Sequence, residues 1–257
     1  MSITNLTNAA NREVCNVHIV DYKTGEPYMD YRYANTTGLS LTSDSVAARG
    51  HGAERVTFYD PLTGEFTISA QVYPHKLLAL YSDGVIDTTA SYYVKETIKC
   101  ATAGELPLAV TGGTVVAGTV FVYAVGDYGG TKIAGTYATN KFTATETTDI
   151  TVGAEYEVGF MVARTEGVQT IVLNNKRTPK SVAIYLDTFD KDEEDNIIPK
   201  RIIIKKASVN RNPNLSYSSD GDPQTLDMSF KILEKDRDNV VEVVEITEEI
   251  QVNPASN

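Results

Sequence analysis

The chain has 257 residues and a formal net charge of -11, from 23 Lys and Arg against 34 Asp and Glu. With 42% hydrophobic and 22% charged residues, its composition is that of a folded protein and not of a disordered chain. The excess of acid argues against a protein that reads nucleic acid, which needs a basic surface. The 30 Thr, 26 Val and 17 Ile are β-branched residues that favour strands. The sequence therefore predicts a mainly β protein of one large domain or two small ones.

Membrane, secretion and metal signals are missing from the sequence. No apolar run approaches the roughly 18–20 residues of a bilayer span, and residues 1–12 are too polar for a signal peptide. Cys15 and Cys100 do not have the spacing of metal ligands and are expected to be reduced, packed thiols of a protein made in a cytoplasm. No HxH or HxxxH pair occurs among the histidines, which are His18, His51 and His75. We therefore expect no cofactor and no metal.

The first clear element is a β-hairpin predicted over residues 56–72. Val56 and Phe58 alternate with polar residues, and residues 60–64 carry the Pro and Gly of a turn. Residues 65–72 then alternate strictly, which is typical of a strand with one buried and one exposed face. The predicted core face of this strand holds Phe66, Ile68, Ala70 and Val72.

One short helix is predicted next. Residues 74–84 begin with Pro and end in Gly, the expected asymmetry for a helix. Leu77, Leu78 and Tyr81 fall on one stripe at helical spacing, so they are expected to pack on the preceding sheet.

The middle of the chain predicts further short strands. A strand is expected over 91–100, and candidates follow at 119–125, 141–144 and 156–162, in a region rich in Gly, Thr, Ala and Val. We expect residues 101–165 to form either a β-rich insertion or more of one sheet, in a core made of residues 1–100 and 166–257 with an N-terminal arm, 1–12.

The last third resumes the clean alternation. Strands are predicted over 181–187 and 200–206, joined by an acidic loop at 190–196. Residues 238–251 suit a strand by propensity and a helix by spacing, so both remain open. Another half-buried strand spans 225–232, with its core face formed by Leu226, Met228, Phe230 and Ile232.

The acidic loop at 190–196 is the first place to suspect a metal site. Counted from Asp190, an EF-hand needs Gly at the sixth position and Glu at the twelfth, where this chain has Asp195 and Arg201. The loop is therefore predicted to be a solvated hairpin tip. The chain has no P-loop, GxGxxG or GxSxG pattern, and the glycine-bearing loops 49–52 and 111–114 are interpreted as mobile loops or bulges. We predict a protein that is not an enzyme.

Three segments together resemble the tail tube proteins, or major tail proteins, of long-tailed bacteriophages. The first, residues 55–84, passes from a strand through a turn into a Thr-bearing strand and then a short helix ending in Gly. The second is residues 179–189 with the acidic hairpin and residues 200–206. The third, residues 212–230, carries Gly-Asp-Pro ahead of an alternating strand. They cover roughly 100 residues in the family's order. Residues 101–165 lie outside the match, and the resemblance implies that they form a β-rich insertion, an outer-surface subdomain.

The resemblance implies a physical mechanism. Its expected fold is mainly β, a β-sandwich or half-barrel with one short helix, which closes into a β-barrel within a homohexameric ring. Rings stack into a tube in the virion, duplex DNA passes through an acidic lumen without specific binding, and sheath, baseplate and tail terminator proteins are further partners. The hairpin 187–206 and the arm 1–12 are candidates for inter-ring contacts. The named contact residues are Asp190, Asp192, Glu193, Glu194, Asp195, Asn196 and Ile197.

Two other classes stay open at the level of sequence. A different phage structural component, such as a capsid decoration, baseplate or tail terminator β-module, shares the composition. An enzyme or a metal-dependent binding module is the third class, and calcium-dependent stabilisation would favour it.

Overall fold

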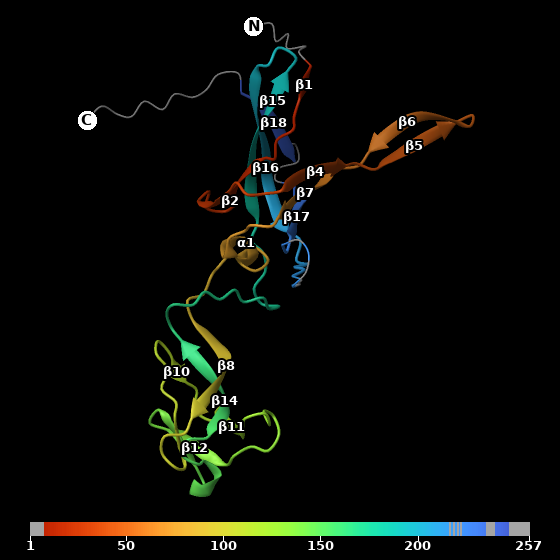
Figure 1. The fold of residues 1–257 in the computed structure, drawn as a ribbon. Coiled ribbons are helices and arrows are strands. Elements are labelled where there is room, and N and C mark those ends of the chain that lie inside the picture. The colour runs from red at the N-terminus through yellow and green to blue at the C-terminus, as the bar shows by residue number, and fades with distance from the viewer. Residues whose placement is uncertain are drawn as a thin grey trace. The chain divides into compact units, whose positions relative to one another are not determined.

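A computed structural model describes residues 8–215, 217, 219, 221, 223–234 and 240–246. The chain forms two compact units (Figure 1). The split unit comprises residues 1–85 and 173–257, and the inserted unit comprises residues 86–172. The structure is mainly β with one short α-helix, which confirms the predicted fold class.

The split unit is built on a nine-stranded antiparallel sheet. The path through it is β3-β2-β15-β16-β17-β7-β4, while β1 pairs with β15 and β18 pairs with β16. Its strands are β1 (Ala9–Ala10), β2 (Asn16–Asp21), β3 (Pro27–Tyr31), β4 (Thr36–Thr42), β7 (Thr63–Ala70), β15 (Val182–Asp192), β16 (Ile197–Val209), β17 (Leu226–Ile232) and β18 (Val241–Glu245).

The core of this sheet follows from period-2 alternation. In β17 every second residue is buried, and in β7 the same pattern buries Phe66 and Ile68. The two strands pair so that Phe66 lies opposite Phe230, with ring centroids 5.8 Å apart. Relative exposures are at most 2% for these core residues: Phe66, Ile68, Leu226, Met228 and Phe230.

The helix α1 (His75–Ala79) is shorter than predicted. Leu77 and Tyr81 are buried, and Leu78 is partly buried against the same core, as its stripe position predicts. The segment after Ala79 continues as turns, and the amide of Gly84 donates back to the carbonyl of Ala79 at 3.0 Å. Gly84 has a φ of 77°, which a glycine adopts without steric cost.

The predicted hairpin over residues 56–72 is wrong. β6 (Ala53–Tyr59) pairs with β5 (Ser45–Gly50), not with β7. Both edges of β7 are already occupied, because β4 and β17 flank it. The turn residues between Tyr59 and Thr63 therefore carry the chain from one ladder to another.

Val72 is a second correction. We placed it on the core face, but β7 ends at Ala70 and Val72 is 67% exposed. The chain turns towards α1 at this point, where the amide of Gln71 donates to Asn35 Oδ1 and the Tyr31 hydroxyl donates to the carbonyl of Val72. The alternation of buried and exposed residues therefore ends at Ala70, two residues before the alternation of apolar and polar residues in the sequence.

The inserted unit has its own core between two small sheets. One has the order β10-β14-β11, with β8 on the other edge of β14, and the second has the order β12-β13-β9. Its core includes Leu106, Val122, Val158 and Phe160. Its elements are β8 (Ala90–Lys99), β9 (Glu105–Pro107), β10 (Thr114–Val115), β11 (Phe121–Ala124), β12 (Gly135–Ala138), β13 (Lys141–Ala144), the 3₁₀ turn η1 (Thr147–Asp149) and β14 (Glu155–Arg164).

The limits of the inserted unit are set by strand pairing. β8 pairs with β14 along all ten of its residues, which brings residues 90–99 into this unit together with 101–165. At its base, Asp87 and Thr170 form an antiparallel bridge with hydrogen bonds of 2.9 and 2.8 Å. The chain therefore enters and leaves the inserted unit at neighbouring points.

The ambiguous segment 238–251 resolves in part as a strand. Residues 241–245 form β18, which pairs with β16 from Lys200 to Ile204. Residues 238–239 and 247–251 of the segment lie outside the described residues.

Candidate assembly surfaces

The acidic hairpin is the first candidate surface. β15 and β16 pair as far as Lys191 and Ile197, leaving a short turn at 192–196. Asp192 Oδ1 accepts hydrogen bonds from the amides of Glu194 at 2.9 Å and Asn196 at 2.7 Å. The Asn196 side-chain hydrogen bond holds the pKa of Asp192 below its ordinary value. The tip is thus built from its own backbone and side-chain hydrogen bonds.

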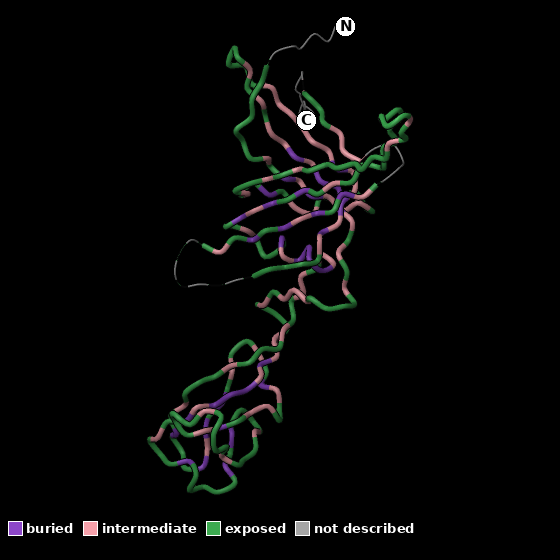
Figure 2. The backbone as a smooth tube through the Cα atoms, turned by 90° about the vertical axis from the view of Figure 1, so that its right-hand side faces the viewer, coloured by how far each residue is buried: buried purple, intermediate pink, exposed green. Residues whose placement is uncertain are grey.

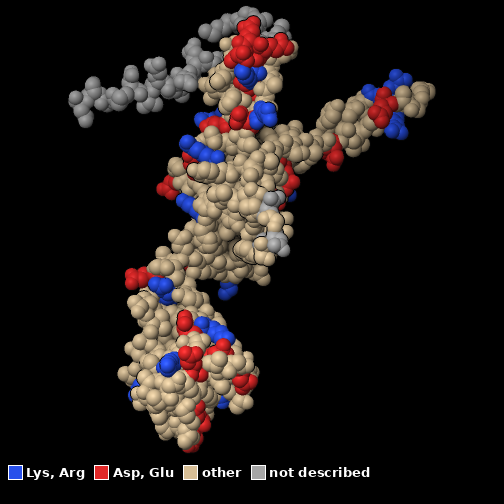
Figure 3. Space-filling view, viewed as in Figure 1, with Lys and Arg blue, Asp and Glu red and all other residues tan. Residues whose placement is uncertain are grey.

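The predicted contact residues of this tip divide into two groups. Asp190 forms an ion pair with Lys200 and accepts a hydrogen bond from Asn11, and Asp192 accepts hydrogen bonds from the backbone of the turn. The other five residues are exposed, and Figure 3 shows acidic side chains gathered at this end of the hairpin. Those exposed residues are Glu193, Glu194, Asp195, Asn196 and Ile197.

The exposed acids of the tip differ in how far they are neutralised. Asp195 lies 2.6 Å from Lys191 Nζ, and Glu193 accepts a hydrogen bond of 3.0 Å from Asn8. Glu194 has no side-chain partner among the described residues. Of the predicted N-terminal arm, residues 1–7 lie outside the described residues, while β1 pairs with Lys191 and Asp192. The negative charge of the tip is therefore least neutralised at Glu193 and Glu194.

A β-hairpin that the sequence did not predict forms the second candidate surface. We call residues 45–59, which contain β5 and β6, the β5–β6 arm (Figure 1). Every residue of β6 is exposed, and most of the arm is green in Figure 2. His51 and Gly52 at its tip both have positive φ, as a tight hairpin turn requires, so the loop 49–52 is a turn.

One face of the β5–β6 arm is apolar. Val46 lies opposite Phe58, and Ala48 lies opposite Val56, so these four side chains share a face. Val46 is 65% exposed and Phe58 is 64% exposed. A two-stranded hairpin is marginal in water unless a further surface covers it. The alternation at Val56 and Phe58 is the sequence signal of this strand, and it places both side chains on the apolar face.

A cluster of charged side chains lies at the base of the acidic hairpin. His18 contacts Asp30 at 3.2 Å and Asp187 at 3.0 Å. Arg201, opposite Asp187 in the ladder, makes two hydrogen bonds to its carboxylate, at 2.5 and 2.7 Å. Burial raises the pKa of Asp187, but the Arg201 hydrogen bond and charge, with His18, outweigh it and leave the pKa lowered.

The lowered pKa of Asp187 predicts a pH-dependent loss of stability. A carboxylate with a depressed folded-state pKa stabilises the fold fully above its unfolded pKa of about 4, and this contribution disappears as the pH falls through the folded pKa. Asp187→Asn is therefore expected to melt at a lower temperature than wild type at pH 7, with the gap closing as the pH falls below about 4. Thermal melting of both proteins across this range measures the gap. A constant gap would contradict the assignment.

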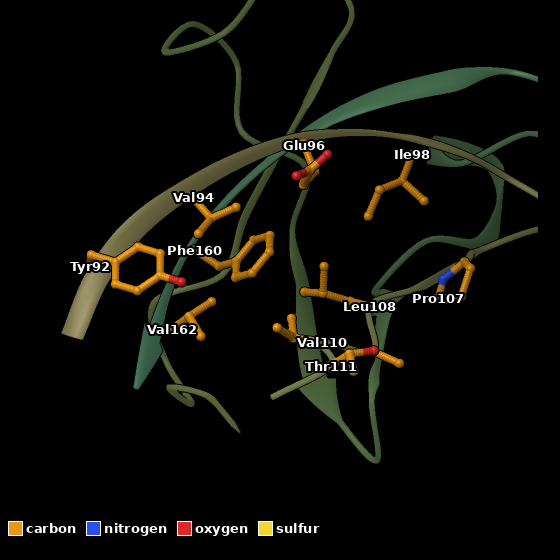
Figure 4. Close-up of a pocket in the computed structure, with 11 residues that line it drawn as sticks. Tyr92, Val94, Glu96, Ile98, Pro107, Leu108, Val110, Thr111, Phe160 and Val162 are labelled. Carbon is orange, nitrogen blue, oxygen red and sulfur yellow. The ribbon is translucent and has the colours of Figure 1, made fainter. Parts of the chain in front are cut away.

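The inserted unit contains a groove of about 470 Å³ (Figure 4). Val94 and Ile98 of β8, with Phe160, form much of its apolar wall, and residues 107–111 face them. Glu96 is the one charged residue among those that line it.

In the described part of the chain, no group of three or more His, Cys, Asp or Glu side chains is placed to hold a metal ion. No helix there has the length and apolar character needed to cross a bilayer. Cys15 and Cys100 are free thiols, and Cys100 is buried.

The mainly β fold and its exposed strands define a structural protein with surfaces suited to association. Residues 11–246 match the model of the YomU/Tube protein family, and the chain belongs to this family. The match confirms the resemblance to phage tail tube proteins and identifies a structural component of the tail. A comparison with curated proteins gave no match.

Proposed function

We propose that this protein polymerises as stacked homohexameric rings into the phage tail tube, the conduit through which DNA is ejected. The observation that carries the proposal is the apolar face of the β5–β6 arm, exposed in the single subunit of a tube-family protein. Exposed apolar faces of this kind mark sites of protein association. A second copy of the same chain is the partner available in a homopolymer, so the arm supplies a subunit–subunit contact.

The open edges of the large sheet support ring formation. β3 and β4 end the path through the described sheet, and each presents one edge with no strand beside it. An unpaired edge is a template for pairing with another chain, and closure of a barrel removes it. Six copies arranged edge to edge close the ring, and the ring makes contacts above and below with further rings.

The charge of the protein suits a passage for DNA. A net charge of -11 opposes binding of phosphates, and an acidic lumen lets the duplex slide without specific contacts. In the assembled tail, sheath, baseplate and tail terminator proteins are the further partners. A map of the assembled tube in which Lys and Arg line the lumen would contradict this part of the proposal.

Electron microscopy of the purified protein at rising concentration tests the proposal. Because each subunit adds to an existing end, we expect hollow filaments or stacked rings to appear above a critical concentration, with a pore that admits duplex DNA. Small particles of constant size, even after filament seeds from phage tails are added, would contradict it. A capsid decoration protein would instead bind capsids and leave the seeds unextended.

A further inference from the structure

A second hollow lies on the split unit, at the turn between β2 and β3. It has a volume of about 530 Å³, and we call it the lysine pocket. Three of its side chains are cationic and one, Asp21, is acidic. Its lining residues are Asp21, Tyr22, Lys23, Thr24, Lys180, Ser181 and Lys206.

Among the described residues, no ion pair neutralises the cations of the lysine pocket. Asp21 is occupied by its own turn, because its Oδ1 accepts hydrogen bonds from the amides of Lys23 at 2.8 Å and Thr24 at 2.9 Å. These bonds, with a smaller contribution from the charge of Lys180, lower the pKa of Asp21. Lys206 lies over the Tyr22 ring at 5.2 Å.

Other lysines of the same sheet differ in having ion-pair partners. Lys191, Lys200 and Lys205 each have a carboxylate partner within the subunit. Within the described residues, Lys23, Lys180 and Lys206 form no ion pair. In a protein with an excess of 11 negative charges, three gathered ammonium groups without ion-pair partners favour an anionic occupant.

The pocket and the acidic tip, residues 190–196, lie at opposite ends of one hairpin. At the pocket end, Val182 of β15 lies opposite Asp21 of β2 and Ala207 of β16. At the other end, Lys191 lies opposite Ile197, and the turn at 192–196 begins. β15 has 11 residues, so at about 3.4 Å per residue the two sites are about 34 Å apart along the strand.

We propose that the acidic tip of one copy binds in the lysine pocket of the next copy, with Glu193 and Glu194 facing Lys23, Lys180 and Lys206. This inference rests on the proposed function and names the two surfaces that join successive subunits along the tube. Two different patches at opposite ends of a subunit make a head-to-tail contact, which repeats without closing and generates a filament. The two patches carry opposite charge, which fixes their register and speeds encounter.

Reciprocal charge reversal tests the contact. Variant T carries Glu193→Lys and Glu194→Lys, and variant P carries Lys180→Glu and Lys206→Glu. Each variant alone presents like charges at the junction, so its critical concentration for filaments is expected to rise at least tenfold. An equimolar mixture of T and P, and a single chain carrying all four changes, restore opposite charges and are expected to polymerise near the wild-type concentration.

A matched control separates the contact from the effect of net charge. Lys99→Glu with Lys132→Glu changes two exposed lysines of the inserted unit by the same total charge as variant P, and it is expected to polymerise normally. Variants T and P shift net charge in opposite directions, so general repulsion cannot block both. Circular dichroism and thermal melting of every variant verify that the fold is retained.

The outcomes are distinguishable. Wild-type protein that never forms filaments counts against the proposed function itself. Wild-type filaments with T and P polymerising normally, or with no rescue in the mixture, overturn the pairing of tip and pocket. If duplex DNA binds wild type and variant T but not variant P, while both variants polymerise normally, the occupant is a nucleic-acid phosphate and the proposal is also overturned.

Discussion

Phe66→Asp is expected to abolish folding, and Ile68→Asp is expected to do the same. Phe66 has 0% exposure and packs on Phe230 at the centre of the large sheet. Loss of the ring from a core costs about 3–5 kcal/mol, and an unpaired buried carboxylate adds several more, against a total stability of about 5–15 kcal/mol. Soluble expression, circular dichroism and a melting curve measure the result.

Thr67→Asp is the matched control for the core substitutions. Thr67 lies between Phe66 and Ile68 on β7 but on the exposed face of the strand. The control protein is expected to remain soluble and to melt within a few degrees of wild type, since exposed substitutions change stability by about 0.5 kcal/mol or less. Normal melting of Phe66→Asp would refute the assigned core face.

Truncating the apolar face of the β5–β6 arm is expected to block assembly and leave the fold intact. Val46→Ser with Phe58→Ser removes a cross-strand pair that is already exposed in the single subunit. The melting temperature therefore stays close to wild type. An aromatic anchor buried at an interface contributes about 2 kcal/mol or more, which corresponds to about a thirtyfold rise in the critical concentration for filaments. Light scattering against protein concentration measures this value.

A control for the arm comes from the inserted unit. Val125 and Val152 are 55% and 64% exposed, so Val125→Ser with Val152→Ser also removes exposed apolar surface. This variant is expected to polymerise at the wild-type concentration. Equal behaviour of the two variants, whether both assemble or both fail, would remove the arm from the subunit interface.

Local patterns in the sequence predicted four of the nine strands of the large sheet, which are β7, β15, β16 and β17. The alternation in β17 and at Phe66 and Ile68 reports burial directly, because side chains of a strand point to opposite faces in turn. The Pro and Gly around α1 likewise predicted a helix there, although the helix ends at Ala79 and the residues up to Gly84 form turns. These signals are local, so no knowledge of strand pairing was needed.

Strand partners could not be predicted in the same way. The turn chemistry at 60–64 suggested that β6 pairs with β7, but β7 already pairs with β4 and β17. Such pairing depends on competition among strands far apart in the sequence, which a local pattern does not contain. The lysine pocket was missed for the same reason, since Lys23, Lys180 and Lys206 are brought together by the pairing of β2, β15 and β16.

The bridge between Asp87 and Thr170 gives the chain a modular character. Because the inserted unit begins and ends at adjacent backbone positions, its 87 residues are topologically equivalent to one long loop of the split unit. A short turn, or an unrelated domain with similarly close termini, can take its place without changing the path of the large sheet. The same position is thus a natural graft point, at which each subunit of a polymer would display one copy of a chosen cargo.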